Sequence, residues 1–265
     1  MLECVINVSE GRDLGLITRI ASAAGSSLLD VHSDPHHNRS VLTVVGETAA
    51  RAVTSVAVAE LDLREHHGVH PRLGVVDVVP FVALDGSTLQ QALEARDRFA
   101  SWLSEVHEVP CFLYGPERTL PDLRREAFRS LAPDVGPPAP HPTAGATAVG
   151  QRDVLVAFNL WIDDADLSSV RQIAADSRGP GIRALGLLVG DRLQVSMNLV
   201  EPTSVGPAEA ADRVGALAQA RGAQVVGAEL VGLIPRSVLD RVPRDRWTEL
   251  DLSDARTIEA RVGAR

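Results

Sequence analysis

The sequence predicts an α/β protein of the α+β kind, made of two ferredoxin-like subdomains with mixed or antiparallel sheets and helices on the outside. Two observations predict this fold. Short apolar segments alternate with amphipathic ones, and the order strand-helix-strand-strand-helix-strand occurs twice along the 265 residues. We expect an N-terminal subdomain over residues 1–150 and a C-terminal subdomain over residues 151–265. Chains of this size can bury a real core in each half.

The first copy of this order fills the first third of the chain. Its expected strands are Glu3–Val8, Ser27–Val31, Ser40–Val45 and a Val-rich run that starts at Leu73 and stops at Pro80. Proline cannot donate to a β ladder, which is why we end the last strand there. One helix follows the apolar positions Leu14, Ile17, Ile20 and Ala21 and stops at Gly25, and a second covers Thr48–Leu61.

The second copy begins at Val154. Its expected strands are Val154–Trp161, Ile182–Val189, Arg192–Leu199 and Gln224–Leu230. Gly190-Asp191 is a hairpin turn signal between the middle two strands. A helix over Asp166–Ala175 is expected to be capped near Asp163 or Asp164, and Pro207 opens a helix that runs to Ala220. A closing helix is expected near Asp254–Val262.

Between the two copies the sequence predicts a long helix over Ser87–Val106 and a strand at Cys111–Tyr114. The segment Pro133–Gly150 is rich in proline and glycine, and we expect neither regular helix nor a central strand in it. Two interpretations stay open for this segment. It is either a linker between subdomains or a loop whose backbone lets a ligand approach closely.

Composition excludes several classes of function. The net charge of −9 argues against general nucleic-acid binding. All 26 basic residues are arginine, so Schiff-base lysine chemistry and a Walker-type phosphate loop are excluded. No apolar run reaches membrane-spanning length. Cys4 and Cys111 lie in apolar surroundings without metal-ligand spacing, which favours buried thiols and a cytoplasmic protein.

The stretch from His66 to Phe81, HHGVHPRLGVVDVVPF, carries the strongest signal for chemistry. Six of the eight histidines lie between His32 and His70, and His70 and Arg72 stand at the entrance of an expected strand. Histidine moves protons near neutral pH, and arginine binds carboxylates in paired hydrogen bonds. This pattern favours general acid–base catalysis on a ligand that carries carboxylates.

The same histidines allow a metal site as an alternative. His66 and His70 are four residues apart, as two ligands on a helix would be. Gly68 and Pro71 oppose a helix there, and no cysteine flanks the cluster. We therefore expect no metal, and a metal-dependent hydrolase that uses the histidines between His32 and His70 remains the rival hypothesis.

Several segments together resemble the glutamate formiminotransferase family, the transferase half of formiminotransferase-cyclodeaminase. In the first half they are ECVINVSEG from Glu3, LLDVHSDPHHNRSV from Leu28 and the HHGVHPRLGVVDVVPF stretch. In the second half they are GATAVGQRDVLVAFNLWI from Gly145, QVSMNLVEP from Gln194 and VVGAELVGLIP from Val225. The matches follow the family's order over about residues 3–235.

The resemblance implies two ferredoxin-like halves and transfer of a formimino group from N-formiminoglutamate to tetrahydrofolate, the co-substrate, in histidine breakdown. It places the catalytic histidine at His70, which takes the proton from the attacking folate nitrogen and returns it to the departing amine. It also implies a homodimer. The expected substrate- and folate-binding residues are Asn38, Arg39, Arg72, Gly136, Pro137, Pro142, Thr143 and Gly145. For Arg39 and Arg72 the alternative is an ion pair that braces a loop.

The chain departs from the family pattern near the expected site. His32 stands where the family has aspartate, His36-His37 replace a Ser-Thr pair, and Val69 replaces the glutamate before the catalytic histidine. These changes leave the donor open among formimino and formyl amino acids. A folate-binding protein without catalytic activity is a further alternative. Asp77 interrupts an apolar strand, so we expect it to have a polar partner.

Overall fold

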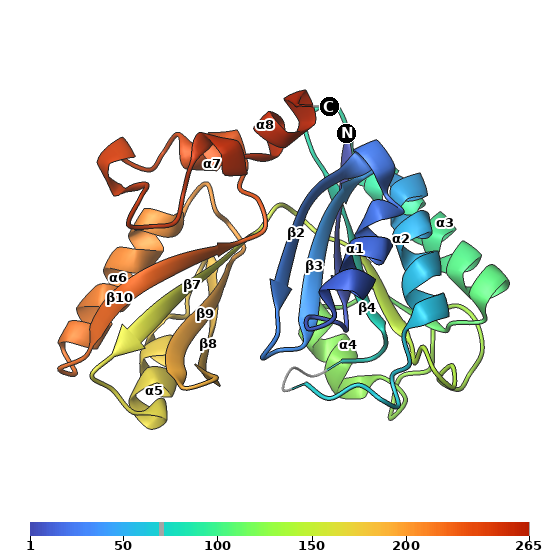
Figure 1. Cartoon of the computed structure of the whole chain (residues 1–265), viewed down its shortest axis with the longest axis horizontal. Helices are drawn as coiled ribbons and strands as arrows, with labels where there is room; N and C mark the ends of the chain where they lie inside the picture. Colours follow the sequence, from blue (N-terminus) through green and yellow to red (C-terminus); the bar gives the residue numbers. More distant parts are fainter. Residues whose placement is uncertain (69–71, 265) are drawn as a thin grey trace. The chain divides into compact units, whose positions relative to one another are not determined.

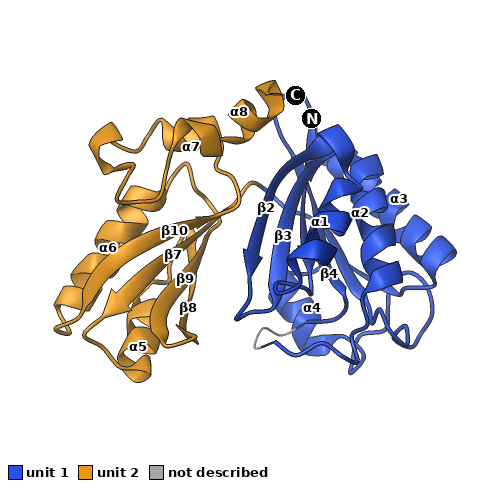
Figure 2. Cartoon of the chain, in the orientation of Figure 1, with its two compact units in different colours: residues 1–153 blue, residues 154–265 orange. Residues whose placement is uncertain are grey.

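The computed structural model describes residues 1–68 and 72–264. The chain folds into two compact units, Met1–Asp153 and Val154–Arg265, which Figure 2 shows in separate colours. Each unit contains the predicted strand-helix-strand-strand-helix-strand order around its own sheet, so the predicted fold class is confirmed.

The first unit is built on a six-stranded mixed sheet in the order β2-β3-β1-β4-β6-β5 (Figure 1). Its elements are β1 (Leu2–Val8), α1 (Leu14–Ser22), β2 (Leu28–Asp34), β3 (Arg39–Val45), α2 (Glu47–Glu60), β4 (Val76–Ala83), α3 (Leu89–His107), β5 (Cys111–Tyr114), α4 (Leu120–Glu126) and β6 (Thr147–Gln151). β1 pairs antiparallel with β3 and β4. β6 lies between β4 and β5 and is parallel to both.

Side-chain alternation divides the core of this unit between the two faces of the sheet. Val79 of β4 and Val149 of β6 belong to the large core beneath α1, α2 and α3. Their neighbours Val78 and Ala148 point the other way, into a smaller core with Leu123 of α4. The short helix α4 therefore covers the opposite face at the β4-β6-β5 end of the sheet.

Three expectations for this unit are wrong. β2 runs on to Asp34, beyond the expected end of this strand at Val31. β4 continues through Pro80 to Ala83: Pro80 lacks one N–H, but Phe81 and Val82 are fully buried and resume the pairing with β1. β6 is a central strand within the segment expected to contain none. The prolines of that segment all precede residue 143, so they leave its last residues able to pair.

The second unit has a four-stranded antiparallel sheet in the order β10-β7-β9-β8. Its elements are β7 (Val156–Asp163), α5 (Leu167–Ser177), β8 (Ile182–Val189), β9 (Arg192–Leu199), α6 (Pro207–Gln219), β10 (Gln224–Val231), α7 (Arg236–Leu239) and α8 (Ile258–Gly263). The bounds of β8 and β9 match the prediction, and α6 begins at Pro207 as expected. The core packs α5 and α6 against one face of the sheet.

The expected N-cap of α5 is wrong. Asp166 caps this helix, and its side chain accepts a hydrogen bond from the Ser169 N–H at 2.7 Å. Asp164 has a φ of 56° and accepts a hydrogen bond from the Gln224 side chain at 2.6 Å. It therefore belongs to the turn that precedes the helix.

Two glycines allow two segments of the first unit to cross in direct backbone contact. A Cβ atom on Gly74 would lie 2.3 Å from the Ala144 carbonyl oxygen, and one on Gly145 would lie 2.3 Å from the Leu73 carbonyl oxygen. Gly145 has a φ of +72°, which favours glycine. The crossing is held by hydrogen bonds from Val75 N to Ala144 O at 2.9 Å and from Ala146 N to Leu73 O at 3.0 Å.

The crossing makes a prediction for stability. Gly74→Ala should lower the free energy of unfolding by about 3 kcal/mol or more, because the new methyl group meets backbone atoms that cannot move away. Gly215→Ala is the matched control, since a Cβ there meets nothing within 4 Å. This change within α6 should stabilise the chain by about 0.5–1 kcal/mol. Urea unfolding measures both, and equal effects of the two changes would contradict the prediction.

A buried hydroxyl group leads to a second prediction for stability. Among the described residues, Thr54 Oγ1 in α2 is the buried side-chain atom without a hydrogen-bond partner. Thr54→Val should therefore raise the free energy of unfolding by about 1 kcal/mol. Thr147 is the control because its buried Oγ1 donates to Val76 O at 2.8 Å, so Thr147→Val should lower stability by about the same amount. A loss of stability in Thr54→Val, measured by denaturant unfolding, would sink the prediction.

Candidate functional site

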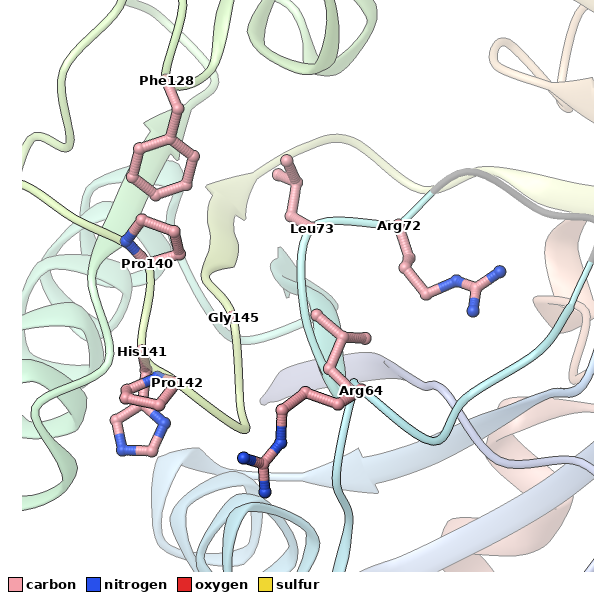
Figure 3. A pocket seen from close by; sticks show the side chains of 9 residues that line it. Arg64, Arg72, Leu73, Phe128, Pro140, His141, Pro142 and Gly145 are labelled. Atoms are coloured by element: carbon pink, nitrogen blue, oxygen red, sulfur yellow. The ribbon is translucent and has the colours of Figure 1, made fainter.

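A groove of about 460 Å³ opens in the first unit beside the glycine crossing. One side carries Phe128 and Pro140 and the other carries Leu73 and Arg64 (Figure 3). The groove is mostly apolar, with two arginines and one histidine among its lining residues. These lining residues are Leu63, Arg64, Arg72, Leu73, Phe128, Pro140, His141, Pro142 and Gly145.

The proline-rich loop gives the groove a fixed wall. His141 and Gly145 exchange two backbone hydrogen bonds of 2.8 and 2.9 Å. Leu63 N donates to Thr143 O at 2.7 Å and so joins this loop to the segment that follows α2. The site residues predicted at Pro142 and Gly145 line the groove, whereas Thr143 supports it from behind through its backbone.

His141 is a lining residue that the sequence did not single out. Its Nδ1 accepts hydrogen bonds from the backbone N–H groups of Ala144, at 3.0 Å, and Thr143, at 3.3 Å. Since Nδ1 accepts, the tautomer that fits these contacts carries its proton on Nε2. The signal that could have found it is its position between two prolines of a ligand-loop candidate, Pro140 and Pro142.

Gly136 and Pro137 do not line the groove. Gly136 has a φ of +95°, and a Cβ there would lie 2.4 Å from Ser104 Oγ of α3. This end of the loop therefore packs against the C-terminal part of α3. The structure brings only the second half of the expected folate-binding stretch to the groove.

Arg72 and Asn38 hold the segment that leads into the groove. Arg72 donates to the carbonyl oxygens of His66 at 3.4 Å and Gly68 at 2.5 Å, and its guanidinium extends away from Phe128 and Pro140 (Figure 3). The buried Asn38 accepts from Gly11 N at 2.9 Å and donates to His67 O at 3.1 Å. Both predicted binding residues thus carry bracing contacts within the protein.

Asp77 has the polar partner that the sequence led us to expect. It is 2 % exposed, its Oδ2 lies 2.5 Å from Arg124 Nη2 of α4, and its Oδ1 accepts from Leu73 N at 2.7 Å. Asp77 therefore anchors the strand entrance that carries Arg72. Arg124 was not predicted as this partner because the short helix α4 was not expected from the sequence.

Arg39 adds a further cation beside this ion pair. Its Nε donates to Asn7 Oδ1 at 3.2 Å. Burial lowers the pKa of Arg39 to about 10, with the nearby charge of Arg124 lowering it further and that of Asp77 opposing the shift. Burial also lowers the pKa of Arg72, again against the attraction of Asp77. Three guanidinium groups around one carboxylate give this region a positive excess that suits anionic ligands.

The histidines at the tip of the β2-β3 hairpin have local roles. Asp34 Oδ1 accepts from the backbone N–H groups of His36 at 2.7 Å and His37 at 2.9 Å. Outside this hairpin, in the segment after α2, His66 Nδ1 lies 3.3 Å from the Asn38 amide nitrogen and must accept a hydrogen bond from it. Within residues 1–68 and 72–264, no group of three or more His, Cys, Asp or Glu side chains is arranged to hold a metal ion.

His70, the expected catalytic residue, and Val69 lie outside the described residues. The geometry of the site therefore leaves their roles as predictions. In the part of the chain that is described, no helix is both long enough and apolar enough to cross a membrane.

Comparisons with known proteins show which family the chain belongs to. Residues 1–152 match the family model of the formiminotransferase domain, N-terminal subdomain. Glutamate formimidoyltransferase of Streptococcus pyogenes serotype M1 is 35% identical, with 90% of each chain covered. Glutamate formimidoyltransferase of Thermoplasma acidophilum is 31% identical, covering 90% of this chain and 89% of that enzyme.

A longer relative matches over the same part of this chain. Formimidoyltransferase-cyclodeaminase of Sus scrofa is 34% identical over 90% of this chain, but the match spans only 51% of that protein. The two glutamate formimidoyltransferases above are matched over about nine-tenths of their length. The chain therefore belongs to the formiminotransferase family of transferases.

Proposed function

We propose that this protein transfers a formimino group from N-formiminoglutamate, or a related formimino or formyl amino acid, to tetrahydrofolate. The observation that carries the proposal is the near full-length match to two glutamate formimidoyltransferases. The proposed place of the reaction in metabolism is histidine breakdown and one-carbon transfer.

The groove of the first unit supports folate as the co-substrate. Leu63, Leu73, Phe128 and the two prolines offer apolar surface to a flat heteroaromatic ring. Arg64 and Arg72 lie at the same groove, and arginine is suited to the carboxylates of a folate or amino-acid tail. We assign Asn38 and Arg39 to the same site through their contacts with its supporting loops, and Gly136 and Pro137 through the family pattern.

His70 is the proposed general acid–base group of the N-terminal unit. The folate nitrogen attacks the formimino carbon, and His70 takes the proton from that nitrogen. The bond between the carbon and the donor's amine then breaks, and His70 returns the proton to the departing amine. The proton is conserved, and the products are the free amino acid and the formimino-folate.

The proposal also covers the localisation and the oligomeric state of the protein. Among the described residues, Cys4 and Cys111 are buried free thiols, which fits the reducing cytoplasm. We also propose a homodimer, for which sedimentation of the purified chain is the direct measurement.

The catalytic assignment predicts a large kinetic effect. His70→Ala should reduce kcat for formimino transfer by about 10²–10⁴-fold, because the proton transfers lose their catalyst, while folate binding changes little. His67→Ala is the control, since its exposed neighbouring imidazole has no assigned role. A coupled absorbance assay of the formimino-folate measures turnover. Near wild-type turnover in His70→Ala would remove the assignment.

The metal-dependent hydrolase makes the opposite prediction for metal removal. If the protein is the proposed transferase, dialysis against a strong chelator leaves turnover unchanged, because no step needs a metal. The protein should be purified without a histidine tag and its metal content measured in parallel. Stoichiometric zinc or iron, with activity lost on chelation and restored by the metal, would support the hydrolase.

A further inference from the structure

The four-stranded sheet of the second unit has two edge strands, β10 and β8 (Figure 1). The residues that follow β10 cover its outer edge. Leu230 N donates to Asp251 Oδ2 at 2.9 Å, and the Arg256 guanidinium donates to Leu230 O. Such cover matters because an open edge presents backbone groups that can pair with another strand. The edge of β8 differs from that of β10 in this respect.

The β8-β9 hairpin decides which backbone groups of β8 point outward. Its two-residue turn makes Val189 and Arg192 a hydrogen-bonded pair, and such pairs alternate along an antiparallel ladder. The hydrogen bond from Val200 N to Gly181 O, at 2.8 Å, fits the same alternation. The outward backbone groups of β8 therefore belong to every second residue, namely Ile182, Ala184, Gly186 and Leu188.

Only the first half of this outer edge is covered. Ile182 exchanges two backbone hydrogen bonds of 3.1 and 3.3 Å with the preceding turn, and Ala184 O accepts from Arg178 Nε at 2.9 Å. No other described residue is hydrogen-bonded to the outward groups of Gly186 or Leu188. These two residues present N–H groups and carbonyl oxygens with which a further strand can pair.

The side chains along this edge are apolar. Leu185 is 57% exposed and Leu188 is 52% exposed. Ile182 and Ala184 point into the core beneath α5 and α6, so Leu185 and Leu187 project from the opposite face of the sheet. An open edge with exposed leucines is typical of a surface that pairs with another chain.

The helix α5 leaves this edge accessible. A Cβ atom on Gly186 would lie 2.6 Å from Arg171 Cα of α5. Because the Cβ atoms of a strand point out of the plane of the sheet, the helix covers the face of β8 and not its hydrogen-bonding side. A second strand can therefore approach β8 in the plane of the sheet.

The β8 edge of a second copy of the chain fits this edge. In an antiparallel pair with a two-fold axis at Leu187, Gly186 of each chain is opposite the partner's Leu188, so the open backbone groups pair with each other. The same register places Arg183 of each chain opposite the partner's Asp191 at the hairpin turn. Both charged residues are exposed, and opposite charges that face each other across two strands stabilise the pairing.

We propose that two chains pair through their β8 edges, antiparallel about a two-fold axis at Leu187, so that two four-stranded sheets join into one sheet. The inference rests on the homodimer put forward with the proposed function, and it names the interface of that dimer. Main-chain hydrogen bonds supply the affinity in this kind of strand addition, and the leucines add buried apolar surface.

A disulfide across the axis tests the register. In a non-hydrogen-bonded antiparallel pair the two Cα atoms are about 4.5 Å apart, which is within the range that a disulfide bridges. Leu187→Cys should therefore give a covalent dimer on mild oxidation, measured on a non-reducing gel. The native thiols of Cys4 and Cys111 are buried and do not compete.

Leu185→Cys is the matched control for this cross-link. It lies on the same face of β8, but its two copies would be about 13 Å apart along the paired strands, too far for a disulfide. It should give little covalent dimer. A Leu187→Cys chain that does not cross-link, or a Leu185→Cys chain that cross-links as readily, overturns the inference.

Sedimentation equilibrium measures the pairing itself. Leu187→Lys places two ammonium groups against each other at the axis, so it should raise the dimer dissociation constant by about 100-fold. Val226→Lys is the control, because Val226 is an exposed apolar residue of the other edge strand, β10, and it should leave the constant unchanged. Unchanged dimerisation of the Leu187→Lys chain contradicts the inference.

The proposals fail in different ways. A wild-type chain that stays monomeric at all concentrations removes the homodimer and its interface together, and the transferase proposal stands. A wild-type dimer that survives Leu187→Lys removes only the β8 interface. Absence of formimino transfer by the wild-type chain removes the proposed reaction, whereas cross-linking and sedimentation still decide the interface.

Discussion

The backbone crossing at Gly74 and Gly145 is the constraint on which the rest of the first unit depends. Two segments separated by about seventy residues touch where side chains would keep them apart. One segment leads from Arg72 into β4, and the other leads from the proline-rich loop into β6. The groove exists because these segments meet there: Leu73 lies on one of them, and His141 and Pro142 lie on the other.

The local charge of the first unit also depends on contacts between segments that are distant in the sequence. Asp77 is a carboxylate in a buried strand, and it is stabilised because Arg124 and the Leu73 N–H both reach it. Arg39 and Arg72 extend the positive charge around this single anion. A chain with net charge −9 thus keeps a locally cationic region in its first unit, which total charge alone would not suggest.

Local signals made much of the fold predictable. Gly190-Asp191 sets the hairpin between β8 and β9 because a two-residue turn fixes the register of its strands, and Pro207 marks the start of α6. Non-local pairing could not be predicted in the same way. Nothing in Thr147–Gln151 shows that it pairs with β4, and the Arg124 partner of Asp77 comes from a helix that sequence periodicity did not reveal.

The candidate site was predictable only in part, because the fold brings together residues that are distant in the sequence. Pro142, Gly145 and Arg72 were expected and line the groove, whereas Phe128 and His141 required the fold to bring them there. Asn38 has a polar side chain in a loop, and only the structure shows that its amide is used to join Gly11 to His67.

The position of β6 has a consequence for how the chain is synthesised. Because β6 lies between β4 and β5, those two strands have no partner for their facing edges until Gln151 has left the ribosome. The nascent chain therefore carries an open apolar edge on β4 from Ala83 onward, and a second one on β5 from Tyr114 onward, until Gln151 is made, a state that invites aggregation. The sheet closes late because β6 must pair with β4, which lies far away in the sequence. Such long-range pairing makes folding slow.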